Sequence, residues 1–129
     1  MDSDTTHQAE VIAASVRKFQ KELNAGTVSL VLLTLVAGTS GPVYGYQIAK
    51  ELEAVSGEGL QIKQGTLYPV LRSLEASGLL SSHVEPSVSG PPRRYYRITD
   101  PGHQALAVWK STWVGTRDFI DGVLEGHLG

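Results

Sequence analysis

The segment at residues 27–36 constrains the fold of this chain more than any other. Seven of its ten residues are aliphatic, namely Val28, Leu30, Val31, Leu32, Leu33, Leu35 and Val36. On a helix these side chains point in nearly every direction, and a helix that is apolar all round must be surrounded by other elements. We therefore predict that this segment is the central core helix, ended by Gly38.

The residues before this segment predict a separate amphipathic helix at 5–24. Its apolar side chains recur at steps of four, three and four residues, which places them on one stripe: Ile12, Val16, Phe19 and Leu23. The residues at 24–26, Asn-Ala-Gly, are typical of a helix end or a bend. The sequence thus predicts an N-terminal helical arm at 1–26.

Two further helices are expected after the core helix. Pro42 suits the first turn of a helix. The apolar residues that follow Pro42 at helical spacing are Tyr44, Ile48, Leu52 and Val55. The next stripe, which predicts a helix at 65–77, consists of Leu67, Val70, Leu71 and Leu74. Gly78 is expected to cap the C-terminal end of this helix. Because proline is tolerated only in the first turn of a helix, Pro69 indicates that the helix begins at or after Gln64.

Two β-type runs at 79–85 and 93–99 are joined by the turn-rich sequence PSVSGPP, which predicts an exposed hairpin. Asp100 and Pro101 then open a last helix, in the order of a cap followed by proline. Its stripe positions alternate at steps of three and four: Leu106, Trp109, Trp113, Thr116, Ile120 and Val123. A heptad-like stripe that extends beyond the core requires a partner helix.

In chain order, these elements predict a mostly α-helical fold with a small β-hairpin. Compact helices followed by a hairpin form the winged helix-turn-helix arrangement, in which the second helix of the turn enters the DNA major groove. We predict an N-terminal helical arm at 1–26, a winged helix-turn-helix DNA-binding domain at 27–99 and a C-terminal dimerisation helix at 100–129. The apolar stripe of the arm suits packing on the C-terminal helix of a partner subunit.

The net charge of −2 gives no reason to expect a nucleic-acid partner. The distribution of the charged residues along the chain, however, favours such a partner. Residues 1–62 carry four bases and seven acids, residues 63–99 five bases and two acids, and residues 100–129 two bases and four acids. The three segments therefore carry −3, +3 and −2. The positive segment contains the expected recognition helix and hairpin, where positive charge is needed to neutralise DNA phosphates. Clustering of three net charges also arises by chance.

Composition and spacing exclude several other classes of protein. The chain has no cysteine, which removes disulfides and thiolate nucleophiles. Its four histidines lack the spacing of a metal site, and no nucleophile elbow or phosphate-binding loop is present, so we expect no metal, no cofactor and no enzyme. The longest apolar run, at 30–38, is too short to span a bilayer, and the acidic start is unlike a secretory signal. We expect a soluble, cytoplasmic protein.

The expected recognition helix exposes the polar groups that remain once its aliphatic side chains face inward: Gln64, Thr66, Tyr68, Arg72 and Ser73. Arg72 suits either a guanine edge or a phosphate, and a solvated helix face would contain the same residue types. In the strand RRYYR, alternation places Tyr96 inward. Arg93 and Arg94 then lie near the hairpin tip, where they reach a phosphate or the minor groove, or merely discourage edge aggregation.

Three ordered motifs resemble the PadR-like transcriptional regulators: VYGYQIAKEL at 43–52, QGTLYPVLRSLEASGLL at 64–80 and GPPRRYYRITDPG at 90–102. The resemblance covers about residues 27–125 and implies a homodimeric winged helix-turn-helix repressor that binds double-stranded DNA. It implies that the second motif holds the start of the recognition helix and the third the wing. The DNA-binding candidates are Tyr44, Tyr46, Lys63, Gln64, Thr66, Tyr68, Pro69, Arg72, Arg93 and Arg94.

The short tail resembles the smaller subfamily, which has a single C-terminal dimerisation helix. In similar members a tryptophan on this helix lies at the dimer interface and stacks flat aromatic ligands, and Trp113 matches that position. Trp109 lies one helical turn earlier, so both indoles line one seam with Ile120. Two alternatives stay open: a small planar aromatic effector between the subunits, or tryptophans that only fill the dimer core.

We expect a sequence-specific repressor that binds a pseudo-palindromic operator as a homodimer. The alternative is a winged-helix protein-interaction module that does not bind DNA, which the small net charge of −2 favours.

Overall fold

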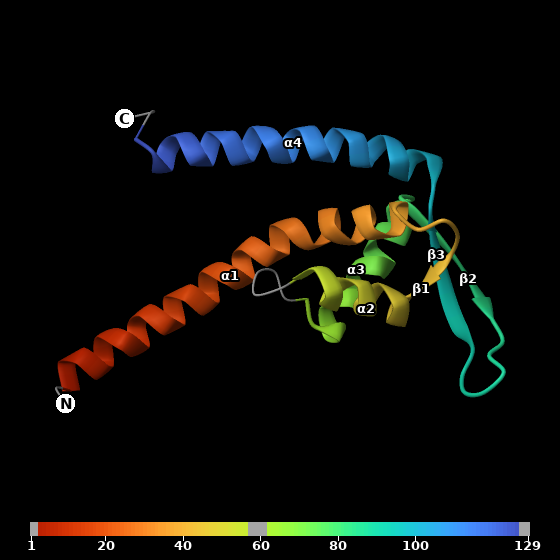
Figure 1. Cartoon of the computed structure of the whole chain (residues 1–129), viewed down its shortest axis with the longest axis horizontal. Coiled ribbons are helices and arrows are strands. Elements are labelled where there is room, and N and C mark those ends of the chain that lie inside the picture. Colours follow the sequence, from red (N-terminus) through yellow and green to blue (C-terminus); the bar gives the residue numbers. More distant parts are fainter. Residues whose placement is uncertain (1–2, 57–61, 127–129) are drawn as a thin grey trace.

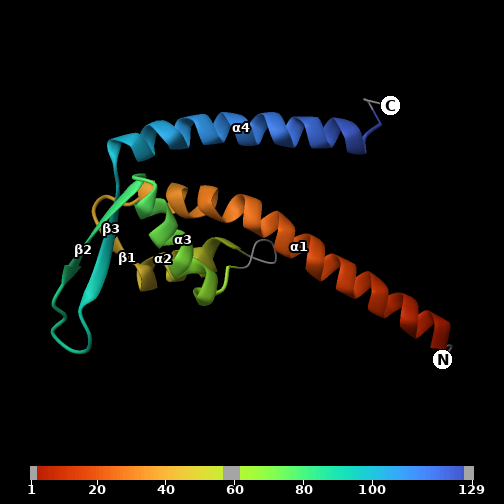
Figure 2. The ribbon, with the colours of Figure 1, turned by 180° about the vertical axis from the view of Figure 1, so that it is seen from behind.

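The computed structural model describes residues 3–56 and 62–126, which form a winged helix-turn-helix with two long helices (Figure 1). In chain order the elements are α1 (Ser3–Ala37), β1 (Val43–Tyr44), α2 (Gly45–Ser56), α3 (Gln64–Ala76), β2 (Leu80–Glu85), β3 (Arg93–Ile98) and α4 (Asp100–Leu124). Helices α1 and α4 lie close at the sheet end and diverge toward their free ends, as the view from behind also shows (Figure 2). The predicted fold class is confirmed.

The predicted helix break at 24–26 is wrong, because α1 continues through it as one helix of 35 residues. Gly26 costs about 1 kcal/mol relative to alanine inside a helix, which is too little to end a long helix by itself. Thr27 Oγ1 also donates to the Leu23 carbonyl at 3.0 Å, across the expected break. The expected arm and the expected core helix are therefore two halves of α1.

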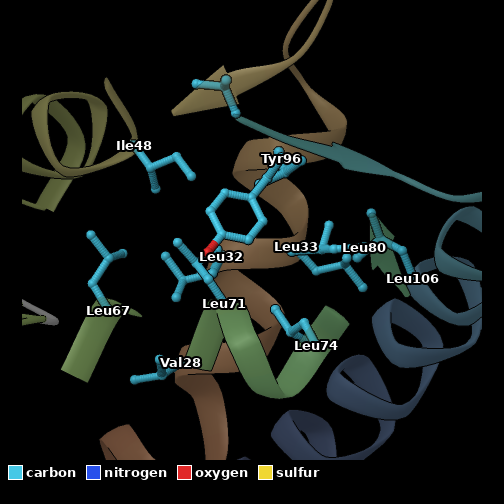
Figure 3. Close-up of a cluster of buried hydrophobic side chains, with 12 residues drawn as sticks. Val28, Leu32, Leu33, Ile48, Leu67, Leu71, Leu74, Leu80, Tyr96 and Leu106 are labelled. Atoms are coloured by element: carbon cyan, nitrogen blue, oxygen red, sulfur yellow. The ribbon is translucent and has the colours of Figure 1, made fainter. Parts of the chain in front are cut away.

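The C-terminal half of α1 is the central core element, as the sequence predicts. Its buried side chains meet those of α2, α3, the sheet and the start of α4 in one cluster (Figure 3). The cluster consists of Val28, Leu32, Leu33, Val36, Val43, Ile48, Leu67, Leu71, Leu74, Leu80, Tyr96 and Leu106. Leu32 and Leu33 are fully buried. Truncation of either to alanine should cost about 2–5 kcal/mol of stability.

Tyr44 lies in a strand, and its predicted place in a helical stripe is wrong. Val43 and Tyr44 form β1, which pairs antiparallel with β3. Pro42 therefore precedes a strand rather than opening a helix, and α2 begins at Gly45. The Tyr44 N–H donates to Gln47 Oε1 at 3.1 Å, so a side chain from the first turn of α2 reaches back across its start. A strand of two residues is too short for alternation to reveal it.

Helix α3 begins at Gln64, within one residue of its predicted start, and Pro69 lies inside it. The proline removes the hydrogen bond that position 69 would donate to the Gly65 carbonyl. At the other end, Gly78 has φ of 83° and donates to the Glu75 carbonyl at 2.9 Å. Ser77 is thus the C-cap residue, and Gly78, the predicted cap, follows it in the left-handed conformation that glycine favours.

The wing is the predicted hairpin of β2 and β3, which pair antiparallel over six residue pairs. The sheet order is β1-β3-β2, so β3 also holds the strand that precedes α2. Thr99 is the N-cap of α4, and its Oγ1 accepts from the Gly102 N–H at 3.0 Å. Asp100 is therefore the first helical residue rather than the cap, and positions 127–129 of the predicted helix lie outside the described residues. No helix in the described part of the chain is long and apolar enough to cross a membrane.

Candidate nucleic-acid interface

A groove of about 470 Å³ lies where the start of α2, one flank of α3 and the wing meet. It is lined by Tyr44, Gly45, Tyr46, Tyr68, Arg72, Pro92, Arg93, Arg94 and Tyr96. Six of the ten DNA-binding candidates are among these residues, although they come from four separate elements, β1, α2, α3 and β3. Guanidinium and phenol groups are hydrogen-bond donors, and arginine pairs with phosphate through two parallel bonds. The groove therefore suits an anion.

Glycine at position 45 allows Tyr68 of α3 to pack against the first turn of α2. A Cβ atom on Gly45 would lie 3.1 Å from both Cζ and Oη of Tyr68, which is tighter than most real contacts. The Tyr68 side chain is 39% exposed, so α2 covers one part of the ring and solvent reaches the rest. This contact holds the N-terminal half of α3 against α2.

Arg93 of the wing lies over the ring of Tyr44, with its guanidinium carbon 4.6 Å from the ring centroid. The Tyr44 ring also packs against Tyr95 at a centroid distance of 5.5 Å and against Tyr46 at 6.2 Å. Lys50 Nζ lies 5.5 Å from the centroid of the Tyr46 ring. A row of three tyrosines thus holds one cation from the wing and one from α2.

Arg94 is connected to α3 through a serine. Its Nη1 donates to Ser82 Oγ at 2.9 Å, and Ser82 Oγ donates to Glu75 Oε2 at 2.5 Å. Ser82 lies on β2 and Glu75 near the C-terminal end of α3, so the two bonds connect both wing strands to that helix. Arg94 therefore has an intramolecular role that separate sequence motifs could not reveal.

The Tyr96 hydroxyl reports the electrostatics of the groove. Burial raises the pKa of Tyr96 above its ordinary value, because the residue is only 3% exposed and the charged phenolate is poorly solvated there. Arg94 and Arg72 lower the pKa and Glu75 raises it, each by a smaller amount than burial. Two arginines from different elements therefore act on one hydroxyl of the groove.

The remaining candidates on α3 and at its N-cap lie outside the groove lining. Lys63 is the N-cap residue of α3, and Lys63, Thr66 and Pro69 are exposed. At 100° per residue, Pro69 lies on the side of α3 opposite the buried Leu71. These three residues are free to approach another molecule, while the side chain of Gln64 is outside the described part of the structure.

Several residues of this surface are absent from the candidates predicted from the sequence. Pro92 lines the groove, Lys50 contacts the tyrosine row, and Ser82 holds Arg94. Ser82 could have been found by aligning the two strands of the hairpin, because it lies opposite Tyr96 in the register of β2 with β3. Lys50 has no such signal, because its neighbour Tyr46 is exposed and belongs to no apolar stripe.

The described residues contain no group of three or more histidine, aspartate or glutamate side chains placed to hold a metal ion. His83 and Glu85 of β2 form an exposed pair at 2.9 Å. The donors that line the groove are arginine and tyrosine side chains, which bind anions rather than metal cations.

The predicted dimer-seam residues divide between the core and the surface. Trp109 is half-buried and packs against the core cluster of its own chain. Trp113 is 39% exposed and Ile120 is 45% exposed. The stripe on the N-terminal half of α1 is exposed as well: Ile12, Val16, Phe19 and Leu23. Each long helix thus has an apolar face that its own chain leaves open.

Residues 32–108 match the family model described as the Transcriptional regulator PadR-like family. The transcriptional regulator Rv3488 of Mycobacterium tuberculosis is 40% identical to this chain over 86 residues, which are 67% of this chain and 75% of that protein. The match includes sequence that forms the helix-turn-helix and the wing in this structure.

Solved structures show the same architecture. The crystal structure of a PadR family transcriptional regulator from Eggerthella lenta has a TM-score of 0.72 and 31% identity, covering 93% of this chain and 97% of that one. A transcriptional regulator from Clostridium thermocellum has a TM-score of 0.69 and 30% identity, covering 78% and 95%. The first similarity extends over most of the two long helices as well as the winged domain.

Proposed function

This chain belongs to the PadR-like family of transcriptional regulators, and we propose that it acts as a homodimeric repressor that binds double-stranded DNA sequence-specifically. The family and the fold make it a regulator of transcription and not an enzyme. The observation that carries the proposal of DNA binding is the groove, which gathers Arg72, Arg93 and Arg94 beside the exposed side of α3.

In the proposed complex, α3 enters the major groove and the wing follows the DNA backbone. Thr66 and Pro69 are exposed at the start of α3 and approach base edges, with Gln64 beside them in the sequence. Lys63 and Tyr68 contact the backbone. The +3 charge of residues 63–99 attracts the phosphates, whereas the acidic segments on either side limit indiscriminate binding.

The proposed dimer covers the open apolar faces of α1 and α4. On α4 the exposed stripe residues are Trp113, Ile120 and Val123. Spacing of three and four residues makes such a stripe complementary to a helix of a second copy. A two-fold axis would then place the two copies of α3 in major grooves about 34–36 Å apart, which requires a pseudo-palindromic operator. Repression follows when the bound dimer blocks access to the promoter.

We also propose that a small planar aromatic ligand releases the DNA by stacking against Trp113 at the dimer seam. Trp113 offers an exposed indole for stacking, and Trp109 lies one turn away at the edge of the core. Such a ligand acts only if it binds more tightly to a dimer whose recognition helices no longer match the DNA. In a Trp109→Phe variant, titration with flavin-like compounds should change the fluorescence of Trp113. Unchanged fluorescence would show that no such ligand stacks against Trp113.

A mobility-shift titration with DNA from upstream of the protein's own gene tests the proposed repressor. A discrete complex that survives an excess of unrelated DNA is the expected result, and Arg93→Ala should weaken it. A winged-helix protein-interaction module, the function that the net charge of −2 favours, would leave the fragment unshifted at every salt concentration.

A further inference from the structure

We propose that the groove between α2, α3 and the wing is a preformed seat for one backbone phosphate, with Arg72 and Arg93 as its ligands and Arg94 as a positioning residue. Arg72 then binds the DNA backbone and does not read a base. This inference rests on the DNA binding proposed above, and it specifies which part of that binding each arginine serves.

The position of Arg72 on α3 directs it toward the wing. Tyr68 and Arg72 are four residues apart, share one flank of the helix and both line the groove. The side of α3 opposite the buried Leu71 carries Pro69 instead. That side enters the major groove most deeply, so an arginine on the flank meets the backbone at the groove edge.

Arg93 is held in place before any DNA arrives. Its guanidinium lies over the Tyr44 ring at 4.6 Å, and stacking on a ring face leaves the N–H groups at the guanidinium edge able to donate. Tyr44 is itself fixed by the pairing of β1 with β3. An arginine that is already ordered loses less side-chain entropy when it binds a phosphate.

Arg94 has a different role, although it lines the same groove. It donates to Ser82 Oγ, which donates in turn to the Glu75 carboxylate, so part of the charge of Arg94 is offset within the protein. The same bonds attach the wing to α3. Arg94 therefore keeps the strand that carries Arg93 at a fixed distance from the helix that carries Arg72.

The chemistry of the groove matches a phosphate. Guanidinium groups bind phosphate oxygens through paired, charge-assisted hydrogen bonds, and tyrosine hydroxyls add neutral donors. The charges of both arginines reach the buried side of the groove, where Arg94 and Arg72 lower the pKa of Tyr96 while burial and Glu75 raise it. The nearby Glu75 carboxylate already accepts a hydrogen bond from Ser82.

The first test is the salt dependence of binding to a duplex of random sequence. Arg72→Ala should weaken binding about tenfold per subunit and reduce the slope of log K against log salt by about one unit per subunit. Arg97→Ala removes the same charge from β3 outside the groove lining and should change the slope less. Arg72→Lys keeps the charge and should retain most of the slope. Equal effects of the Arg72 and Arg97 alanine variants would overturn the proposal.

The second test asks whether Arg72 and Arg93 hold the same phosphate. Contacts to one shared group are not independent, so the double alanine variant should lose less affinity than the product of the two single losses. Fully multiplicative losses would mean two separate phosphates and would contradict a single seat. Arg94→Ala should lower the affinity but change the slope of log K against log salt less than Arg72→Ala does. An equal change of slope would show that Arg94 binds a phosphate itself and is not a positioning residue.

Selection of preferred sequences from a random duplex pool separates failure of this inference from failure of DNA binding. Wild type and Arg72→Ala should select the same sequence, with circular dichroism showing that the variant is folded. Loss of preference at one base pair in Arg72→Ala would show that Arg72 reads a base. The proposed phosphate seat would then be wrong, whereas the proposed DNA binding would be supported. A wild-type protein that binds no duplex at any salt concentration would refute both proposals.

Discussion

The guanidinium of Arg93 lies over the ring of Tyr44, with its carbon 4.6 Å from the ring centroid. Arg93 belongs to the wing, whereas Tyr44 immediately precedes the first helix of the helix-turn-helix. The contact therefore joins two parts of the proposed DNA-binding surface and fixes the direction in which the wing presents its cation.

Replacing Tyr44 with alanine should weaken DNA binding about two- to fivefold, since an exposed cation–π contact contributes about 0.5–1 kcal/mol. Replacement with phenylalanine keeps the ring and should leave the affinity close to that of wild type. Fluorescence anisotropy with a labelled duplex measures both variants. Equal losses in the two would show that the hydroxyl matters rather than the ring.

Gly45→Ala should destabilise the protein by about 1–3 kcal/mol, because the added methyl group meets the Tyr68 ring where no space exists. Gly65→Ala is the matched control, since its Cβ would have no atom within 4 Å. Urea unfolding gives both free energies. In a Tyr68→Ala background the substitution at Gly45 should cost little, and an undiminished cost there would show that another contact is responsible.

Tyr96 should make stability fall in alkaline solution. Its pKa is raised above the ordinary 10.0 in the folded protein, so the folded state holds the phenolic proton at a pH where the unfolded chain has lost it. This stability is fully present below about pH 10 and is lost as pH rises through the higher folded value. Between about pH 8 and about pH 10.5, the free energy of unfolding of Tyr96→Phe should therefore decline less than that of wild type. Equal declines of the free energy of unfolding in the variant and in wild type would show that Tyr96 does not cause the loss of stability.

Trp113→Asp should convert the proposed dimer to monomers, because it would bury an unpaired charge at the seam. Ser111→Asp introduces the same charge on the opposite side of α4, at an exposed position, and should leave the dimer intact. Light scattering measures the mass of each variant. An undiminished mass for Trp113→Asp would place the dimer contact elsewhere.

Some elements of this fold could be predicted from the sequence because one local cause determines each of them. The core position of Leu32 and Leu33 follows from an all-round apolar helix, and Gly78 ends α3 because glycine tolerates positive φ. Alternation in RRYYR places Tyr96 inside, as the structure confirms. In each case a single periodicity or backbone requirement decides the outcome.

Other features depend on contacts between distant segments. Gly26 predicts a helix end, yet α1 continues past it because the helical residues on both sides offset the small cost of one glycine. The strand at Tyr44 exists only because β3 pairs with it. The bond from Arg94 to Ser82 requires the hairpin register, and six of the DNA-binding candidates gather in one groove only after four elements pack together.

The ratio of two dissociation constants shows whether the protein recognises a DNA sequence. Wild-type protein is titrated by fluorescence anisotropy, at one salt concentration, against a duplex from its own promoter and against a duplex of the same base composition in shuffled order. Specific recognition by a dimer predicts that the promoter duplex binds at least about a thousandfold more tightly. Equal affinity for the two duplexes, or no binding to either, would contradict the account of this protein as a sequence-specific repressor.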